Sequence, residues 1–188
     1  MVDTMNNYKR FVADLASERS DMTFLNSDKD HAIEVLTQIF KHSNSDVRIF
    51  AGSLCSDVGN SLDYIESLSD FIERGGKVHI LLNKYDSESA KSSSLFKRLA
   101  YYISENKSII VKQTSSKPYF SNDPEKKEIH FTLGDDKAYR IETDISKRMA
   151  ECNFNNPMVA KIYIDFFEKL FNQDNAILID IPSLFKLA

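Results

Sequence analysis

The chain has 188 residues, of which 42% are hydrophobic and 28% are charged, the ordinary mix of a globular protein. A chain of this length buries roughly 70% of the surface that it exposes when unfolded, so it needs no disulfide or metal to fold. The formal net charge of −4 disfavours a general nucleic-acid binder, because such proteins need a basic surface to displace counterions.

The cysteine content and the N-terminal region indicate in which cellular compartment the protein is expected. Cys55 and Cys152 lie far apart in the sequence and form no metal-ligand pair, whereas secreted proteins usually carry more cysteines. Residues 1–19 contain no apolar stretch of signal-peptide length, and no window offers the ~20 apolar residues needed to cross a bilayer. We therefore expect a cytoplasmic protein with reduced thiols, no membrane contact, no metal and no cofactor.

The first part of the chain alternates helix and strand signals in an order typical of a parallel sheet. Gly75 and Gly76 supply a left-handed turn between an amphipathic helix and a nearly continuous apolar strand. A strand–helix–strand unit of this kind should have a right-handed crossover. The predicted elements are helices over 4–20, 29–42 and 57–74, and strands over 47–51 and 78–82.

The second part predicts antiparallel strands followed by a long helix. Residues 134–137, Gly-Asp-Asp-Lys, are a strong hairpin signal. Asn156 and Pro157 mark the start of the last helix. A proline is favourable at the first helical position, because the amide hydrogen that it lacks would have no partner within the helix. Residues 115–127 are polar and contain prolines, which indicates a surface loop. The predicted elements are helices over 91–105 and 157–171, strands over 108–112, 128–133, 138–142 and 149–154, and a strand or extended tail over 177–181.

These elements predict an α/β fold with a mixed β-sheet and helices on both faces. We expect an N-terminal helical appendage over residues 1–26, followed by the α/β domain itself over residues 27–188.

Two stretches resemble a phospholipase-D-like domain. Residues 31–82, which include VRIFAGSL and ERGGKVHILL, are similar to the opening βαβ unit of that superfamily. EIHFTLGDDKAYRIE at 128–142 and AECNFNNPMVAKIYIDFFEKLF at 150–171 resemble the strand with the family's His-x-Lys motif, its hairpin, and the Asn-containing strand before the last helix. The chain thus resembles a single phospholipase-D-like half.

The resemblance implies a particular chemistry. In this superfamily a His attacks the phosphodiester as nucleophile and a second His acts as general acid. A Lys two residues after the nucleophile points to the same side of the strand and neutralises the phosphate oxygens. An Asp five residues beyond that Lys, then a Gly-Ser and an Asn, orient these groups.

The motif is degenerate in this chain. His130 matches the catalytic His, but Thr132 stands where the Lys should be and Lys137 where the Asp should be. No Gly-Ser follows at the expected distance. Since one preorganised donor to a developing oxyanion contributes roughly two to three orders of magnitude in rate, the loss of the cation should impair catalysis severely.

Four more residues are candidates for binding a ligand beside His130. Thr132 shares its strand, and Asn153 or Asn155 matches the family's Asn. Tyr139 and Arg140 lie on the hairpin; Arg140 either binds an anion or pairs with a nearby carboxylate, from Glu142 or Asp144. The candidate site residues are His130 as catalytic residue and Thr132, Tyr139, Arg140 and Asn153 as ligand-binding residues.

We expect a non-catalytic phospholipase-D-like module that forms a homodimer and binds a protein partner or a phosphorylated ligand in a remnant cleft. One alternative is a divergent phosphodiesterase or nuclease that uses His130 from two subunits; nucleic acid is a partner that the charge disfavours. Another is a purely structural subunit. The dimer should use the face near the hairpin at 128–142, unless the helix over 4–20 covers that face in a monomer.

Overall fold

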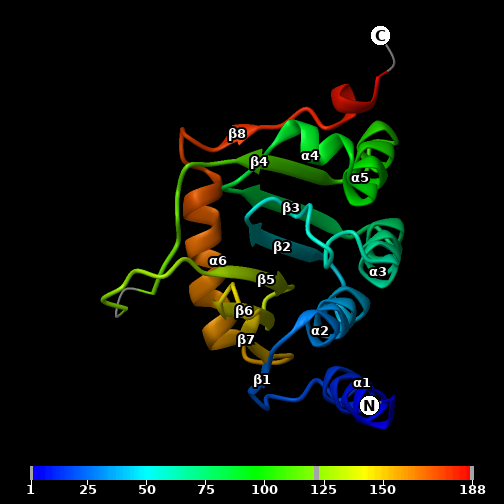
Figure 1. Cartoon of the computed structure of the whole chain (residues 1–188), viewed down its shortest axis with the longest axis vertical. Coiled ribbons are helices and arrows are strands. Elements are labelled where there is room, and N and C mark those ends of the chain that lie inside the picture. Colours follow the sequence, from blue (N-terminus) through cyan, green and yellow to red (C-terminus); the bar gives the residue numbers. More distant parts are fainter. Residues whose placement is uncertain (1, 121–122, 187–188) are drawn as a thin grey trace.

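The computed structural model describes residues 2–120 and 123–186, and they form one mixed sheet between two layers of helices (Figure 1). The eight strands follow the order β1-β7-β6-β5-β2-β3-β4-β8. The prediction of an α/β fold with a mixed sheet is confirmed. The strands are β1 (Phe24–Asn26), β2 (Asp46–Ala51), β3 (Lys77–Leu82), β4 (Ile109–Gln113), β5 (His130–Gly134), β6 (Ala138–Asp144), β7 (Met149–Asn153) and β8 (Ile177–Leu178).

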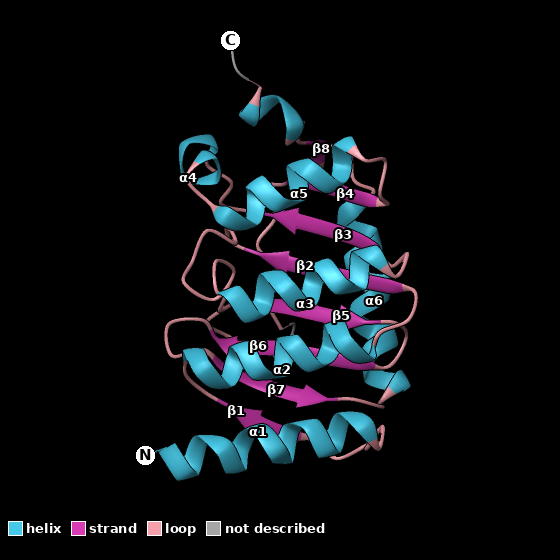
Figure 2. Cartoon of the chain, turned by 90° about the vertical axis from the view of Figure 1, so that its right-hand side faces the viewer, coloured by secondary structure: helices cyan, strands magenta, loops and turns pink. Residues whose placement is uncertain are grey.

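Helices cover both faces of the sheet, but unequally. Four of them lie side by side along one face, with a short fifth above them, while a single long helix, α6, crosses the other face (Figures 1 and 2). The helices are α1 (Val2–Ser17), α2 (Lys29–His42), α3 (Leu62–Glu73), α4 (Ser87–Lys91), α5 (Ser94–Ser104) and α6 (Pro157–Phe171), and a 3-10 turn follows at Pro182–Phe185. None of the described helices has the length and apolar character needed to span a bilayer.

The parallel and antiparallel parts of the sheet meet at β2. On one side β2 runs parallel to β3, with Val47 opposite Val78, and β3 runs parallel to β4. On the other side β2 runs antiparallel to β5, which continues through the hairpin into β6. The predicted βαβ unit is therefore present, with α3 as its crossover helix.

Two predicted helices differ from the observed ones. The helix expected over 57–74 begins only at Leu62, because the Ser61 hydroxyl caps it by accepting from the Tyr64 amide. The chain before it is a tight loop, in which a Cβ on Gly59 would lie 2.3 Å from the Leu54 carbonyl oxygen. The helix expected over 91–105 is split into α4 and α5, since the Ser93 hydroxyl caps a new helix by accepting from the Phe96 amide.

The N-terminal segment is joined to the rest of the fold in two places. The sequence did not predict β1, which pairs with the edge strand β7. Helix α1 packs against α2, where the Tyr8 ring stacks on His31 with centroids 3.7 Å apart. It lies at the end of the helical layer (Figure 2) and not over the β5–β6 hairpin. The boundary at residue 26 stays a prediction.

The hairpin between β5 and β6 is fastened to the start of β2 by one carboxylate. Asp135 occupies the left-handed region at φ 51°. Its carboxylate accepts the backbone amides of Asn44 at 2.9 Å, Ser45 at 2.9 Å and Asp46 at 3.2 Å. Burial would raise the pKa of Asp135, but these amides outweigh it and lower the pKa below the usual 3.8. Asp135 therefore has a structural role.

The carboxylate of Asp135 should contribute to stability in a pH-dependent way. Replacing it in Asp135→Asn should lower the free energy of unfolding at pH 7 by about 1–2 kcal/mol, as the loss of a helix-cap acceptor does. Because the folded pKa is depressed, this difference should be complete above the unfolded pKa and shrink as the pH falls through the folded one. Urea unfolding between pH 7 and pH 2 measures it; an equal loss in Asp136→Asn, at the exposed neighbour, would contradict the assignment.

Candidate functional site

A cavity of about 460 Å³ lies between the sheet and helices α2 and α3, where β2 ends. Strands β5 and β6 line it from one side, and Leu36 and Tyr64 line it from the two helices. The loop after β2 and the segment after β3, with Lys84 and Asp86, form its edge. Ligand sites of α/β proteins commonly lie at the carboxyl ends of parallel strands, and this volume is within their usual range.

The pleat of the sheet decides which side chains reach the cavity. His130 pairs with Glu142 and Thr132 pairs with Arg140, so these four side chains share one face of the sheet. The alternate residues, such as Phe131, point to the opposite face and pack under α6. The structure thus brings together three of the predicted site residues: His130, Thr132 and Arg140.

The other two predicted residues, Tyr139 and Asn153, lie on the opposite face, where they pair with each other. The Tyr139 hydroxyl donates to Glu151 Oε1 over 3.0 Å. The Asn153 amide donates to Asp21 and to Thr23 Oγ1, each over 3.1 Å. The expectation that Asn153 shares a face with His130 is therefore wrong, because the neighbouring Cys152 occupies the position that points to the His130 side.

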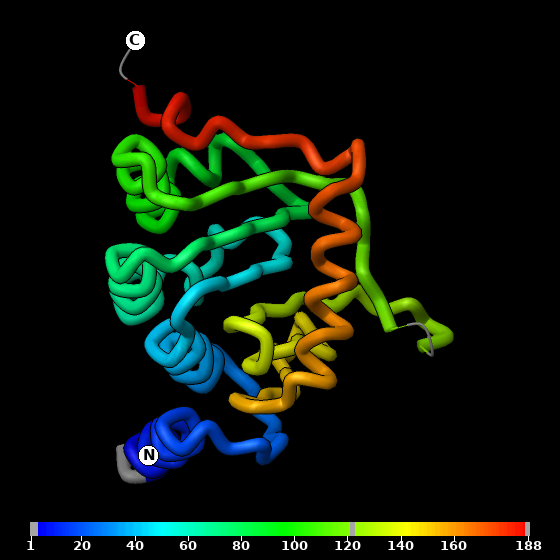
Figure 3. The backbone as a smooth tube through the Cα atoms, turned by 180° about the vertical axis from the view of Figure 1, so that it is seen from behind, coloured from blue at the N-terminus to red at the C-terminus, as the bar shows by residue number. Residues whose placement is uncertain are grey.

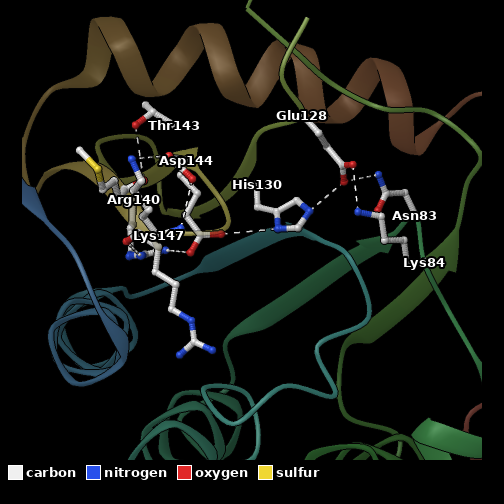
Figure 4. Close-up of polar contacts among 11 residues, drawn as sticks. Asn83, Lys84, Glu128, His130, Arg140, Thr143, Asp144 and Lys147 are labelled. Carbon is white, nitrogen blue, oxygen red and sulfur yellow. Dashed lines mark hydrogen bonds and ion pairs between the residues drawn. The ribbon is translucent and has the colours of Figure 1, made fainter.

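Two carboxylates flank the His130 ring, whose side chain is 14% exposed. Its Nε2 lies 2.9 Å from Glu128 Oε1, and its Nδ1 lies 3.5 Å from Glu142 Oε2. Figure 4 shows the ring between Glu128 on one side and a group of residues that includes Arg140 and Asp144 on the other. Both ring nitrogens are therefore directed at acidic oxygens.

Both carboxylates are held in the ionised state. Burial would raise the pKa of Glu128, but hydrogen bonds from Asn83, Lys84 and His130 outweigh it and lower the pKa to about 2. Burial also opposes ionisation of Glu142, yet His130 and Arg140 lower its pKa below the usual value. At neutral pH both groups therefore accept hydrogen bonds and cannot donate them.

The cations around the cavity are each paired. Arg140, only 5% exposed, donates from Nη1 to Glu142 Oε1 over 3.0 Å and from Nη2 to the Arg148 carbonyl over 3.2 Å. Lys84 lies 3.0 Å from Glu128, and Arg148 lies 2.6 Å from Asp57. Of the two expectations for Arg140, the structure thus shows the pairing with Glu142.

Sequence reasoning missed several residues of this site. The hairpin register offered a signal for Glu142, since a tight turn at 134–137 places it opposite His130. Glu128 precedes His130 by two residues, which is also a readable signal. Tyr64 and Lys84 reach the cavity through packing that is distant in sequence. Among the described residues, no group of His, Cys, Asp and Glu could hold a metal ion.

The Arg140–Glu142 pair predicts a measurable coupling. Replacing one partner, in Arg140→Met, leaves a largely buried carboxylate without its main cation and should lower the free energy of unfolding by about 3 kcal/mol. The double variant Arg140→Met/Glu142→Leu should recover part of that loss, because no uncompensated charge remains. Urea unfolding of both variants and of Glu142→Leu gives the coupling; strictly additive effects would contradict it.

Comparisons with known proteins bear on the fold. No family model matches the chain, and no curated protein matches it. Among solved structures, Nuc, a phospholipase D family member from Salmonella typhimurium, superposes with a TM-score of 0.57 and 13% identity, over 84% of this chain and 97% of that one. NucT from Helicobacter pylori gives 0.57 and 14%, over 84% and 99%.

A third solved structure aligns with more of the chain. TrmBL2, an archaeal chromatin protein described as having a novel mode of DNA binding, has a TM-score of 0.62 and 10% identity. The alignment covers 95% of this chain and 64% of TrmBL2. Likeness at these identities concerns the architecture alone, and it supports the resemblance found in the sequence: this chain has the fold of the phospholipase D superfamily.

Proposed function

We propose that the protein is a non-catalytic phospholipase-D-like module that binds a small ligand in the cavity beside His130. The observation that carries the proposal is the position of the His130 ring between two ionised carboxylates. The ring is held as a structural group, and the cavity next to it remains available for a ligand.

A histidine attacks phosphorus through an unprotonated ring nitrogen whose lone pair points at the substrate. In His130, Nε2 faces the ionised Glu128 at hydrogen-bond distance. A nitrogen facing an ionised carboxylate must carry the hydrogen, because two acceptors cannot bond to each other. The remaining nitrogen, Nδ1, faces Glu142 instead of open space. Neither nitrogen is arranged as a nucleophile.

The surroundings also lack a cation for a reacting phosphoryl group. Thr132 carries no charge, and the nearby Arg140 and Lys84 are neutralised by Glu142 and Glu128. Stabilising the charge that develops on phosphate oxygens requires donors aimed at those oxygens and free to bind them. The two glutamates would instead repel a phosphodiester brought next to His130.

The alternative is a divergent phosphodiesterase or nuclease in which His130 from two subunits acts together. The side chain of His130 is only 14% exposed, which disfavours a direct meeting of two such rings. The activity measurement below separates this alternative from the proposal.

Purified protein should not hydrolyse bis(4-nitrophenyl) phosphate, and His130→Ala should leave this result unchanged, since neither ring nitrogen is free to attack. The release of nitrophenolate measures the rate. His79→Ala is a matched control, because His79 lies on β3, stacks on Phe171 and does not line the cavity. Turnover that is lost in His130→Ala and kept in His79→Ala would refute the non-catalytic proposal.

Self-association remains part of the proposal, but its location changes. Leu36 of α2 and Tyr64 of α3 close part of the cavity beside His130, which leaves less of that face free for a second subunit. Large exposed apolar side chains lie instead on α6, where Met158 is 79% and Ile162 is 65% exposed. Figure 3 shows that α6 lies on the side of the sheet opposite to the other helices. Two-fold pairing of identical copies is the commonest way to cover such a surface.

Light scattering over a concentration series should therefore give a mass near twice 21.6 kDa. Ile162→Glu should shift the protein toward the monomer, because it places a charge at the centre of the apolar surface. Leu62→Glu is the control, since Leu62 is 67% exposed on α3, on the opposite face. A mass near 21.6 kDa at every concentration would remove the dimer from the proposal.

A further inference from the structure

The loop that follows β2 forms one side of the cavity beside His130. Residues 53–59 of this loop, which we call the flap, line the cavity with Ser53, Leu54, Ser56, Val58 and Gly59. The groups on the sheet side of the cavity are little exposed, since Thr132 is 7% exposed and the His130 side chain 14%. A change in the position of the flap therefore changes how far these groups can be reached from solvent.

Both ends of the flap are fixed. At one end, the Gly52 carbonyl accepts from the Lys84 amide over 3.0 Å. At the other end, Asn60 Oδ1 accepts from the Ser93 hydroxyl over 2.7 Å and from the Leu95 amide over 3.3 Å. These bonds hold the ends to the chain after β3 and to the start of α5, so a movement of the loop would be confined to residues 53–59.

Between these ends, the flap has one hydrogen-bonded connection to the rest of the described chain. Arg148 donates from Nη2 to Asp57 Oδ1 over 2.6 Å and from Nη1 to Asp57 Oδ2 over 3.3 Å. This hydrogen bonding lowers the pKa of Asp57, so the pair is charged at neutral pH. The two side chains are partly exposed, and an exposed pair of this kind is readily broken. Apolar contacts of Leu54, Cys55 and Val58 with the core supply the remaining attachment.

The same arginine connects the flap to the group around His130. Arg148 lies in the turn between β6 and β7, at the sheet edge where β2 also ends (Figure 2). Its carbonyl accepts from Arg140 Nη2 over 3.2 Å, and Arg140 Nη1 donates to Glu142, which lies 3.5 Å from His130 Nδ1. A continuous set of polar contacts thus leads from the flap to the His130 ring.

The backbone on both sides of this connection is strained. Leu54 in the flap has a φ of 57°, and Arg148 has a φ of 53°. The left-handed region is unfavourable for residues with a Cβ, and such conformations persist only where the surroundings impose them. The closed flap also brings the Leu54 carbonyl so near to Gly59 that a Cβ there would lie 2.3 Å from the oxygen. The closed position is therefore opposed by the backbone and maintained by the contacts of the flap.

We propose that residues 53–59 open and close over the cavity, and that the Asp57–Arg148 pair is the latch that keeps them closed. This inference rests on the proposed function, because it concerns entry to the same cavity. Opening separates Asp57 from Arg148, relieves the contact between Leu54 and Gly59, and exposes the face of β5 that carries Thr132.

Thiol labelling measures this opening. In the protein Cys55→Ser/Thr132→Cys, the introduced thiol lies in the cavity, and the other cysteine, Cys152, is fully buried. Its reaction with N-ethylmaleimide, an uncharged reagent, should become about two- to fivefold faster when Asp57→Asn is added, the range expected for an exposed ion pair. Mass spectrometry over time gives the rate.

Asp165→Asn is the matched control for this measurement, because it removes the exposed Lys161–Asp165 pair from α6, on the opposite face of the sheet. It should leave the labelling rate unchanged. Equal rates with and without Asp57→Asn would overturn the proposal.

Salt distinguishes a latch from a general weakening of the loop. Raising the salt concentration from about 0.1 M to about 1 M screens exposed charges, so it should accelerate labelling in the protein that keeps Asp57. The Asp57→Asn protein should respond little, because its latch is already broken. An equal response of the two proteins to salt would contradict the role of the pair.

Gly59→Ala tests the closed position without changing a charge. Its methyl group would meet the Leu54 carbonyl oxygen at 2.3 Å, so labelling should be at least as fast as in Asp57→Asn. Gly52→Ala is the control, since its methyl group would meet no atom closer than 3.5 Å. Equal labelling of the two alanine variants would refute the flap. Because these rates involve no ligand and no turnover, a rigid flap and an active phosphodiesterase are separate outcomes.

Discussion

The clamp of Glu128 and Glu142 on the His130 ring is the interaction on which the chemistry of this protein depends. Each glutamate is kept ionised by further donors, Asn83 and Lys84 on one side and Arg140 on the other. The Nε2 of His130 therefore lies at hydrogen-bond distance from Glu128, and its Nδ1 lies 3.5 Å from Glu142. The same pairs neutralise the nearby cations Arg140 and Lys84, and this neutralisation is the basis of the proposal that the protein does not catalyse phosphoryl transfer.

The fold places this cluster by means of a few specific constraints. The turn at Asp135 ties the β5–β6 hairpin to the start of β2, which fixes the register between the antiparallel and parallel halves of the sheet. Under α6, Phe131 packs against Phe50 with ring centroids 5.6 Å apart, and each such buried ring contributes about 1.5–3 kcal/mol. A rigid β5 is thus anchored on one face by aromatic packing, while its other face presents His130 and Thr132 to the cavity.

Local signals in the sequence predicted much of this architecture. The apolar runs of β2 and β3 and the turn residues at 134–137 were sufficient for the βαβ unit and the hairpin. A strand as short as Phe24–Asn26 has no such signal, because pairing with β7 creates it. It was harder to predict which side chains share the face of His130. Tyr139 and Asn153 belong to the same motif as His130, yet the pairing of Arg140 with Cys152 places Tyr139 and Asn153 on the opposite face of the sheet. The partners Tyr64 and Lys84 depend on long-range packing that no local pattern encodes.

The protonation of the His130 ring is the most direct test of the central claim. Protein labelled with 15N-histidine, with the four histidines assigned by substitution, gives the state of each ring nitrogen in a long-range 1H–15N spectrum at neutral pH. The clamp predicts that Nε2 of His130 carries a hydrogen, and that Glu128→Gln changes this resonance while leaving that of His79 in place. An unprotonated Nε2 in the wild-type protein would contradict the account, because the ring would then hold a lone pair available for attack.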